Sequence, residues 1–171
     1  LDESDSKVES LMNDLSSESL FHLEKKGIDR ITDTIKEVEI NSFWAWHIKS
    51  DKEEAYKESR RELAWRARKL EKSLLQHYFS DDECEEIAAN FDSFVDAYFD
   101  RSGNIKDIDI EIANKLCRVF TSTGDLSDLG SEIARFKQFE KMGQTHLSLR
   151  LHDDPKAALD IIGTEVLPHF K

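Results

Sequence analysis

Four basic side chains near the ends of two strand-like segments are the residues of this sequence best suited to chemistry. They are His47, Lys49, Arg150 and His152. Lysine and arginine form strong charge-assisted hydrogen bonds with carboxylates and phosphates, and histidine changes its charge near neutral pH. If the two segments lie side by side, these residues can hold an anionic cofactor tail or an acidic substrate. The alternative is that neighbouring carboxylates pair with them, since buried polar groups normally find partners.

Both segments alternate in the manner of β-strands. In residues 42–49, the apolar Trp44, Trp46 and Ile48 point to one side and the basic residues to the other. In residues 145–151, leucines alternate with polar residues in the same way. We expect the apolar sides to pack against helices. The four basic residues should then face inward, near the carboxyl ends of the two strands.

Helical periodicity fills the chain between and around these strands. Residues 4–38 resemble two or three short amphipathic helices. Apolar residues recur at helical spacing over 52–78, 81–100, 108–120 and 126–142. The expected helix starts are capping boxes at 50–53 and 80–83 and the N-cap pair Asp154–Pro155, and residues 122–125 are expected to form a turn. A strand-to-strand crossover through helices favours a parallel pair, and hence an α/β fold.

Composition narrows the class of protein. The chain has 171 residues, of which 39% are hydrophobic and 35% charged, as in soluble globular domains. No apolar run approaches the roughly 20 residues that span a bilayer, and no signal peptide is evident, so we expect no membrane partner. The net charge of −12 argues against nucleic-acid binding, which needs a basic surface. Cys84 and Cys117 are expected to be reduced core thiols, which suits a cytoplasmic protein.

Other charged groups are weaker candidates for a site. Asp92, Asp96 and Asp100 would line one helix face, where a solvated stripe is a better interpretation than a metal site. The sequence His152-Asp153-Asp154 also carries ligand atoms, but Asp154 fits an N-cap better. We therefore predict no metal. A basic run on the long helix is expected to form an exposed, paired face: Arg60, Arg61, Arg66, Arg68 and Lys69.

The last 48 residues resemble the end of a known enzyme family. GDLSDLGSEIARFKQFEKMGQTHLSLRLHDDPKAALDIIGTEVLPHFK, at 124–171, resembles the C-terminal signature of the luciferase-like monooxygenase superfamily, which includes coenzyme F420-dependent oxidoreductases. The matching places, in order, are the turn at Gly124-Asp125, residues 141–144, the barrel strand at 147–151, and Glu165-Val166-Leu167-Pro168. Residues 43–64 are similar to the seventh strand of that family and the helix after it. Where the family usually carries a glycine-rich turn, this sequence has Ser16-Ser17-Glu18-Ser19.

This resemblance implies a fold and a function. It implies an α/β fold, in which residues 1–171 form a single unit, the C-terminal portion of a (β/α)8 TIM-type barrel that needs about 250 residues. It further implies a flavin- or F420-dependent oxidoreductase that binds FMN or coenzyme F420 and a small-molecule substrate, with no catalytic residue identified. Homo-oligomerisation or association with the missing barrel half would cover the open sheet. The alternative is a non-enzymatic, acidic helical module that binds a basic partner.

Overall fold

A small parallel sheet organises the fold. The computed structural model describes residues 39–67 and 72–170, and its strands are β1 (Asn41–Ile48), β2 (Ser122–Gly124) and β3 (His146–Arg150). Their order is β2-β1-β3, and β1 is parallel to both neighbours. Trp44 lies opposite Leu149, and Trp46 lies opposite Ser122. The two predicted strands and their parallel pairing are therefore confirmed, and the described fold is α/β.

The short strand β2 replaces the turn expected at residues 122–125. Its three residues are buried and pair with the end of β1, and Gly124 O accepts a hydrogen bond from Lys49 N at 3.1 Å. Asp125 then caps the 3-10 turn η1 (Leu126–Asp128), because its side chain accepts from Ser127 N. Ser, Thr and Gly are common in turns, and a strand this short is too brief for an alternation of apolar residues to reveal it.

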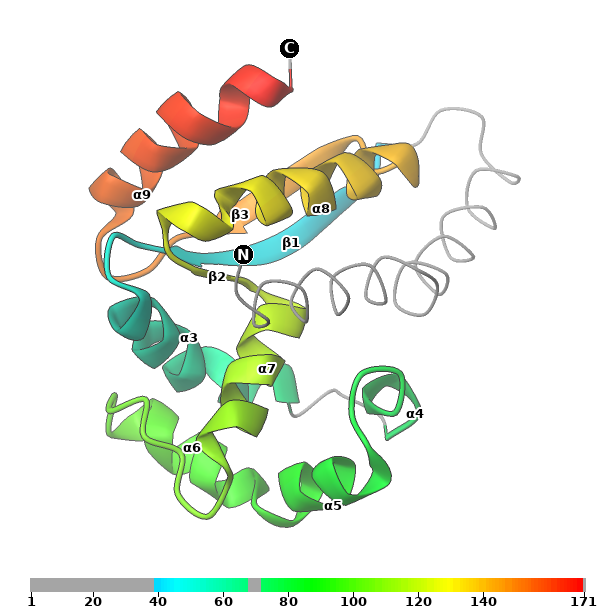
Figure 1. Cartoon of the computed structure of the whole chain (residues 1–171), viewed down its shortest axis with the longest axis vertical. Coiled ribbons are helices and arrows are strands. Elements are labelled where there is room, and N and C mark those ends of the chain that lie inside the picture. The colour runs from blue at the N-terminus through cyan, green and yellow to red at the C-terminus, as the bar shows by residue number, and fades with distance from the viewer. Residues whose placement is uncertain (1–38, 68–71, 171) are drawn as a thin grey trace, which may run out of the picture.

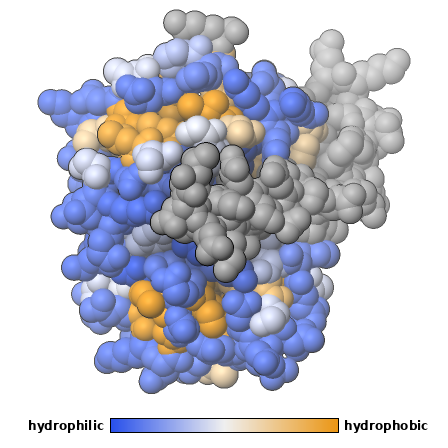
Figure 2. Space-filling model, in the orientation of Figure 1, coloured by the Kyte–Doolittle hydropathy of each residue, from blue (hydrophilic) through white to orange (hydrophobic). Residues whose placement is uncertain are grey.

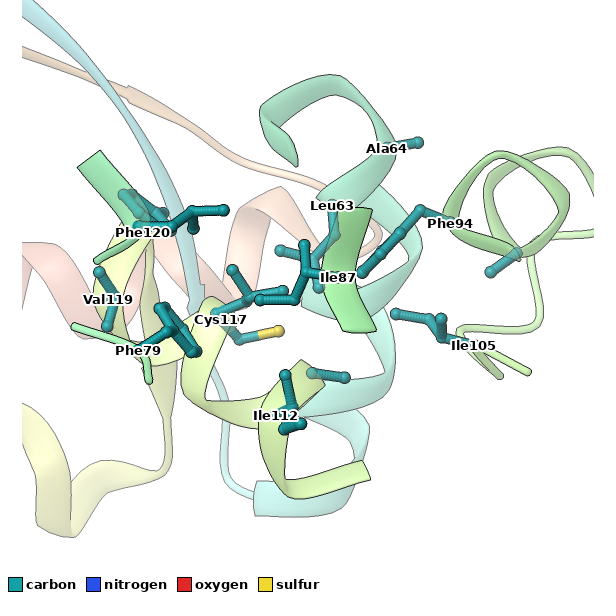
Figure 3. Packing of buried hydrophobic residues seen from close by; sticks show 14 of the residues in the cluster. Leu63, Ala64, Phe79, Ile87, Phe94, Ile105, Ile112, Cys117, Val119 and Phe120 are labelled. Carbon is teal, nitrogen blue, oxygen red and sulfur yellow. The ribbon is translucent and has the colours of Figure 1, made fainter. Parts of the chain in front are cut away.

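A helical lobe connects β1 to β2. It consists of α3 (Lys52–Ala67), α4 (Lys72–Leu75), α5 (Asp81–Ala89), α6 (Phe91–Phe99) and α7 (Ile110–Phe120). In Figure 3, Leu63, Ile87, Phe94 and Cys117 converge at its centre, and each is at most 3% exposed. Burying side chains of this size stabilises a fold by about 1.5–3 kcal/mol each. Cys84 also lies in this core, so both cysteines are buried free thiols as predicted.

A second apolar core covers one face of the sheet. Trp44, Trp46 and Ile48 pack against α8 (Leu129–Lys141) and against the C-terminal segment. That segment contains α9 (Pro155–Ile161), the π-helical turn η2 (Ile162–Val166) and the 3-10 turn η3 (Leu167–His169). The rings of Trp44 and Phe139 meet edge to face, 5.3 Å apart. The expectation that the apolar side of each strand packs against helices is confirmed.

The helix boundaries follow capping chemistry. Ser80 and Glu83 form the predicted capping box, and Asp154 caps α9 with Pro155 in its first turn. The box predicted at 50–53 is wrong by one residue: α3 begins at Lys52, and Asp51 accepts from Glu54 N at 2.9 Å. The predicted single helix over 81–100 is two helices that meet at Asn90, whose side-chain amide donates to Glu86 O.

The remaining expectations concern surfaces and the N-terminal segment. Asp92, Asp96 and Asp100 are exposed, as the solvated-stripe interpretation predicts. The helices expected in residues 4–38, with Ser16–Ser19, lie outside the described residues. Within 39–67 and 72–170, no helix combines the length and the apolar character that crossing a bilayer requires.

The two faces of the sheet are covered by different helices. His47, which alternates with Trp46 and Ile48, bonds to Glu58 of α3, so α3 lies on the face opposite α8 and α9. Figure 1 shows α3 and α7 below the sheet and α9 above it. The helix that follows β1 therefore lies on the other side of the sheet from the helices that follow β2 and β3.

Candidate functional site

The four basic residues predicted from the sequence lie together at the carboxyl ends of β1 and β3. The imidazole rings of His47 and His152 are stacked, with centroids 4.7 Å apart and planes 22° from parallel. His47 is buried, whereas the side chains of Lys49 and Arg150 are 22% and 45% exposed. The pairing of Ala45 with Arg150 across the two strands sets this juxtaposition.

Glu58 of α3 is the centre of one half of the cluster. Its carboxylate, which is 4% exposed, accepts from His47 Nδ1 at 2.8 Å and from Asp153 N at 2.9 Å, and lies 3.0 Å from Lys49 Nζ. Burial alone would raise the pKa of Glu58. The hydrogen bond and charge of His47, with the contacts of Lys49 and Asp153, outweigh burial and lower this pKa to about 2. Glu58 is therefore ionised at neutral pH and fixes the orientation of His47.

Glu62 lies one helical turn after Glu58 and contacts the other two basic residues, Arg150 and His152, at longer distances. Its Oε1 lies 3.6 Å from His152 Nδ1, and its Oε2 lies 3.5 Å from Arg150 Nη2. Both separations are longer than a good hydrogen bond. The His152 side chain is 8% exposed, and among the described residues its Nε2 has no hydrogen-bond partner. Burial first, and then the charge of His47, lower the pKa of His152 to about 4.

The basic run on α3 is paired as predicted, but its exposure was predicted wrongly. Arg60 and Arg61 are 3% and 8% exposed. Arg60 donates to Glu53, Asn114 and the carbonyl of Gly103, and Arg61 donates to Asp153 at 2.7 Å. These side chains are buried because α3 lies between the sheet and the helices α6 and α7. The other members of the run, Arg66, Arg68 and Lys69, are not among the side chains that the structure describes.

Sequence reasoning missed the partners Glu58 and Glu62. A signal was present, because two carboxylates four residues apart on a helix face the same way. That helix directly follows the strand carrying His47 and Lys49. Charged residues are rarely buried unless paired, however, and so a run rich in Glu and Arg resembles a solvated face.

The position of this cluster is one where α/β proteins bind ligands. In open α/β sheets, ligands occupy the crevice beyond the carboxyl ends of neighbouring strands whose following helices lie on opposite faces. β1 and β3 are such neighbours. Lysine, arginine and histidine at this place can bind an anion, and a histidine backed by a carboxylate can also transfer a proton. Among the described residues, no three His, Cys, Asp or Glu side chains form a metal-binding group.

An apolar groove lies on the opposite face of the sheet. It has a volume of about 720 Å³ between α8 and the C-terminal segment, and includes Phe136, Leu147, Ile162 and Val166 in its lining. Figure 2 shows an apolar patch in the upper part of the molecule. None of the four basic residues lines this groove.

Comparisons with family models, with curated proteins and with solved structures found no match.

Proposed function

We propose that this chain is the C-terminal portion of a flavin- or F420-dependent oxidoreductase of the luciferase-like type. The observation that carries the proposal is the parallel neighbours β1 and β3, with His47, Lys49, Arg150 and His152 gathered at their carboxyl ends. Enzymes built on parallel sheets bind cofactors and substrates at that end. Both FMN and coenzyme F420 have an anionic tail, which suits this set of donors.

Each part of the cluster has a distinct role in this proposal. Lys49 and Arg150 are the more exposed cations and would contact the anionic tail. Glu58 orients His47, and the stacked imidazoles of His47 and His152 would form one side of the ligand site. The bound cofactor would supply the hydride chemistry, and the chain would position it and exclude water.

In the barrel form of the proposal, the sheet continues beyond the described strands. β3 pairs with β1 alone among the described strands, which leaves its other edge available to a further strand. A second copy of the chain, or the other half of the barrel, would cover that edge. α3 lies over the carboxyl-terminal part of the face that would line the barrel interior, so in such a barrel it would lie across the mouth.

The test begins with the protein expressed from its native gene without trimming. Its mass and visible absorbance are measured, and FMN and F420 are then added to protein stripped of any chromophore. A yellow protein about twice as large as this chain, or saturable binding of either cofactor, supports the proposal. Arg150→Gln should weaken binding, whereas Lys141→Gln, which removes an exposed charge at the opposite end of the sheet, should leave it unchanged. A colourless protein that binds neither cofactor refutes the proposal.

The alternative, an acidic interaction module, is favoured by a different observation. Phe99 at the end of α6 is 77% exposed beside the acidic Asp96 and Asp100. Figure 2 shows a further apolar patch in the lower part of the molecule. An exposed aromatic ring with acidic neighbours suits a basic partner that carries an apolar side chain. Loss of such a partner on Phe99→Ser, with cofactor binding unaffected, would distinguish the two functions.

A further inference from the structure

The cluster at the ends of β1 and β3 contains a shared carboxylate that connects an exposed cation to a buried histidine. Glu62 lies between Arg150 and His152, one carboxylate oxygen toward each, at 3.5 and 3.6 Å. Neither contact is a tight hydrogen bond. Glu62 is only 5% exposed, so if Arg150 turns away, the buried carboxylate needs another positive charge beside it. Arg150 is 45% exposed and can turn toward solvent, whereas the His152 side chain is 8% exposed and cannot readily do so.

We propose that the carboxyl ends of β1 and β3 form an anion site in which binding of the anion is coupled to uptake of one proton by His152. The anion, of the phosphate or sulfate type, draws Arg150 away from Glu62 and contacts Lys49 as well. Glu62, left without its cation, then forms an ion pair with the protonated imidazole of His152. The proton comes from solvent: an N–H bond forms on the imidazole as an O–H bond of hydronium breaks, and no other covalent bond changes. The inference deepens the proposed function, because the anion stands for the tail of the cofactor.

Charged groups of both signs surround His152 before the anion binds. From α3, Glu58 and Glu62 face the stacked rings, and Arg61 reaches Asp153 beyond β3. The two strands contribute His47, Lys49 and Arg150, and Arg101 contacts Asp153 from the loop after α6. The set contains four permanent cations, three carboxylates and the imidazole of His47, whose charge lowers the pKa of His152. When the anion engages Arg150, the proton on His152 replaces that cation beside the buried Glu62, which lowers the electrostatic cost of the rearrangement.

The direction of the pH effect follows from the state of His152 in the free site. Burial and the charge of His47 hold its pKa near 4, so the ring is neutral at pH 5.5. Releasing Glu62 from Arg150 strengthens its interaction with the imidazolium and raises the pKa of His152. Because the complex then binds more protons than the free protein does, anion affinity increases as the pH falls.

The test uses sulfate, whose own charge is constant over this range, and the full chain at constant ionic strength. Backbone amide shifts of residues 150–153 are followed by NMR at pH 7.5 and pH 5.5. We expect sulfate to bind at least about threefold more tightly at pH 5.5, with tenfold per pH unit as the limit for one proton. On the unmodified protein, sulfate added at pH 5.5 should move the His152 Cε1 proton toward its imidazolium position.

Variants separate the anion contact from the proton. His152→Gln should retain sulfate binding at pH 7.5 and lose the pH dependence, whereas the exposed control His77→Gln should keep it. Arg150→Gln should weaken binding at both pH values, and Lys141→Gln should not.

Each contrary result has its own meaning. Equal affinity at the two pH values, or an unmoved His152 signal in the sulfate-bound protein, overturns the proton coupling but leaves cofactor binding standing. Equal weakening by Arg150→Gln and Lys141→Gln shows an adventitious ion only and overturns the site. Absence of sulfate binding also refutes the proposed anion site. The oxidoreductase proposal is tested separately, by the chromophore measurement on the native protein.

Discussion

Replacing Glu58 by glutamine should cost the fold about 3 kcal/mol at pH 7. The carboxylate is 4% exposed, and its pKa is lowered from 4.5 to about 2 because His47, Lys49 and the Asp153 amide outweigh burial. A depression of about 2.5 pKa units corresponds to about 3 kcal/mol of stability. Removing one partner of a buried ion pair typically costs about 3–5 kcal/mol, which agrees with that value. For a chain of this size the melting temperature should fall by about 6–12 °C.

The pH dependence gives this prediction a second signature. Because the pKa of Glu58 is lower in the folded protein, its stabilising effect is complete above about pH 4.5 and is lost as the pH falls toward 2. The gap in unfolding free energy between the native chain and Glu58→Gln should therefore be constant from pH 7 to pH 5 and smaller at pH 3.5.

Urea unfolding followed by tryptophan fluorescence measures both signatures, because Trp44 and Trp46 are buried in the core on the other face of β1. Glu54→Gln is the matched control on the exposed side of the same helix, and it should change stability by less than about 0.5 kcal/mol. A Glu58→Gln protein within about 1 kcal/mol of the native chain at pH 7, or a gap that does not shrink in acid, would refute this account of Glu58.

Three further predictions concern other parts of the fold. The pKa of His152 is lowered from 6.5 to about 4, so its stabilising effect is complete above pH 6.5 and lost as the pH falls toward 4. After allowance for solvent screening, the native chain should lose about 1 kcal/mol more than His152→Gln between pH 7 and pH 5, as measured by urea unfolding; parallel pH profiles would contradict this. Gly103→Ala should destabilise by about 1–3 kcal/mol, since φ is +66° and a Cβ would clash with Lys57 O; an unchanged melting temperature would contradict this. Ser80→Ala should cost about 1 kcal/mol through loss of the capping box; calorimetry showing no change would rule out that role.

The strands and most helix ends could be predicted because local patterns determine them. Alternation identified β1 and β3, since one side of each strand packs against a helix and the other carries polar residues. Ser80 and Asp154 identified helix starts because capping uses a few side-chain types at fixed spacing. The crossover argument then led to the parallel pairing, and with it to the placement of Lys49 and Arg150 at the same end of the sheet.

What could not be predicted depends on contacts between distant parts of the chain. Ser122 and Thr123 form a strand by pairing with the backbone of β1. The sequence could not predict this strand, because three residues are too few to show a period. The burial of Glu58 and Glu62 depends on α3 packing over β1 and β3, and nothing local distinguishes a buried ion pair from a solvated one. The sequence also does not show which face of the sheet α3 covers. That placement decides whether the basic residues at the strand ends face solvent or carboxylates.

The order β2-β1-β3 also has a consequence for how the chain acquires its structure during synthesis. The central strand β1 leaves the ribosome first, yet Trp44 meets Ser122 only across a separation of 78 residues, and Asn41 meets Ser148 across 107. Contacts so far apart in sequence close slowly, whereas the helical lobe between them can form from nearby residues as soon as it emerges. The nascent chain therefore exposes the aromatic strand β1 without its described partner strands until β2 and β3 have been made, and in this interval the strand is vulnerable to aggregation.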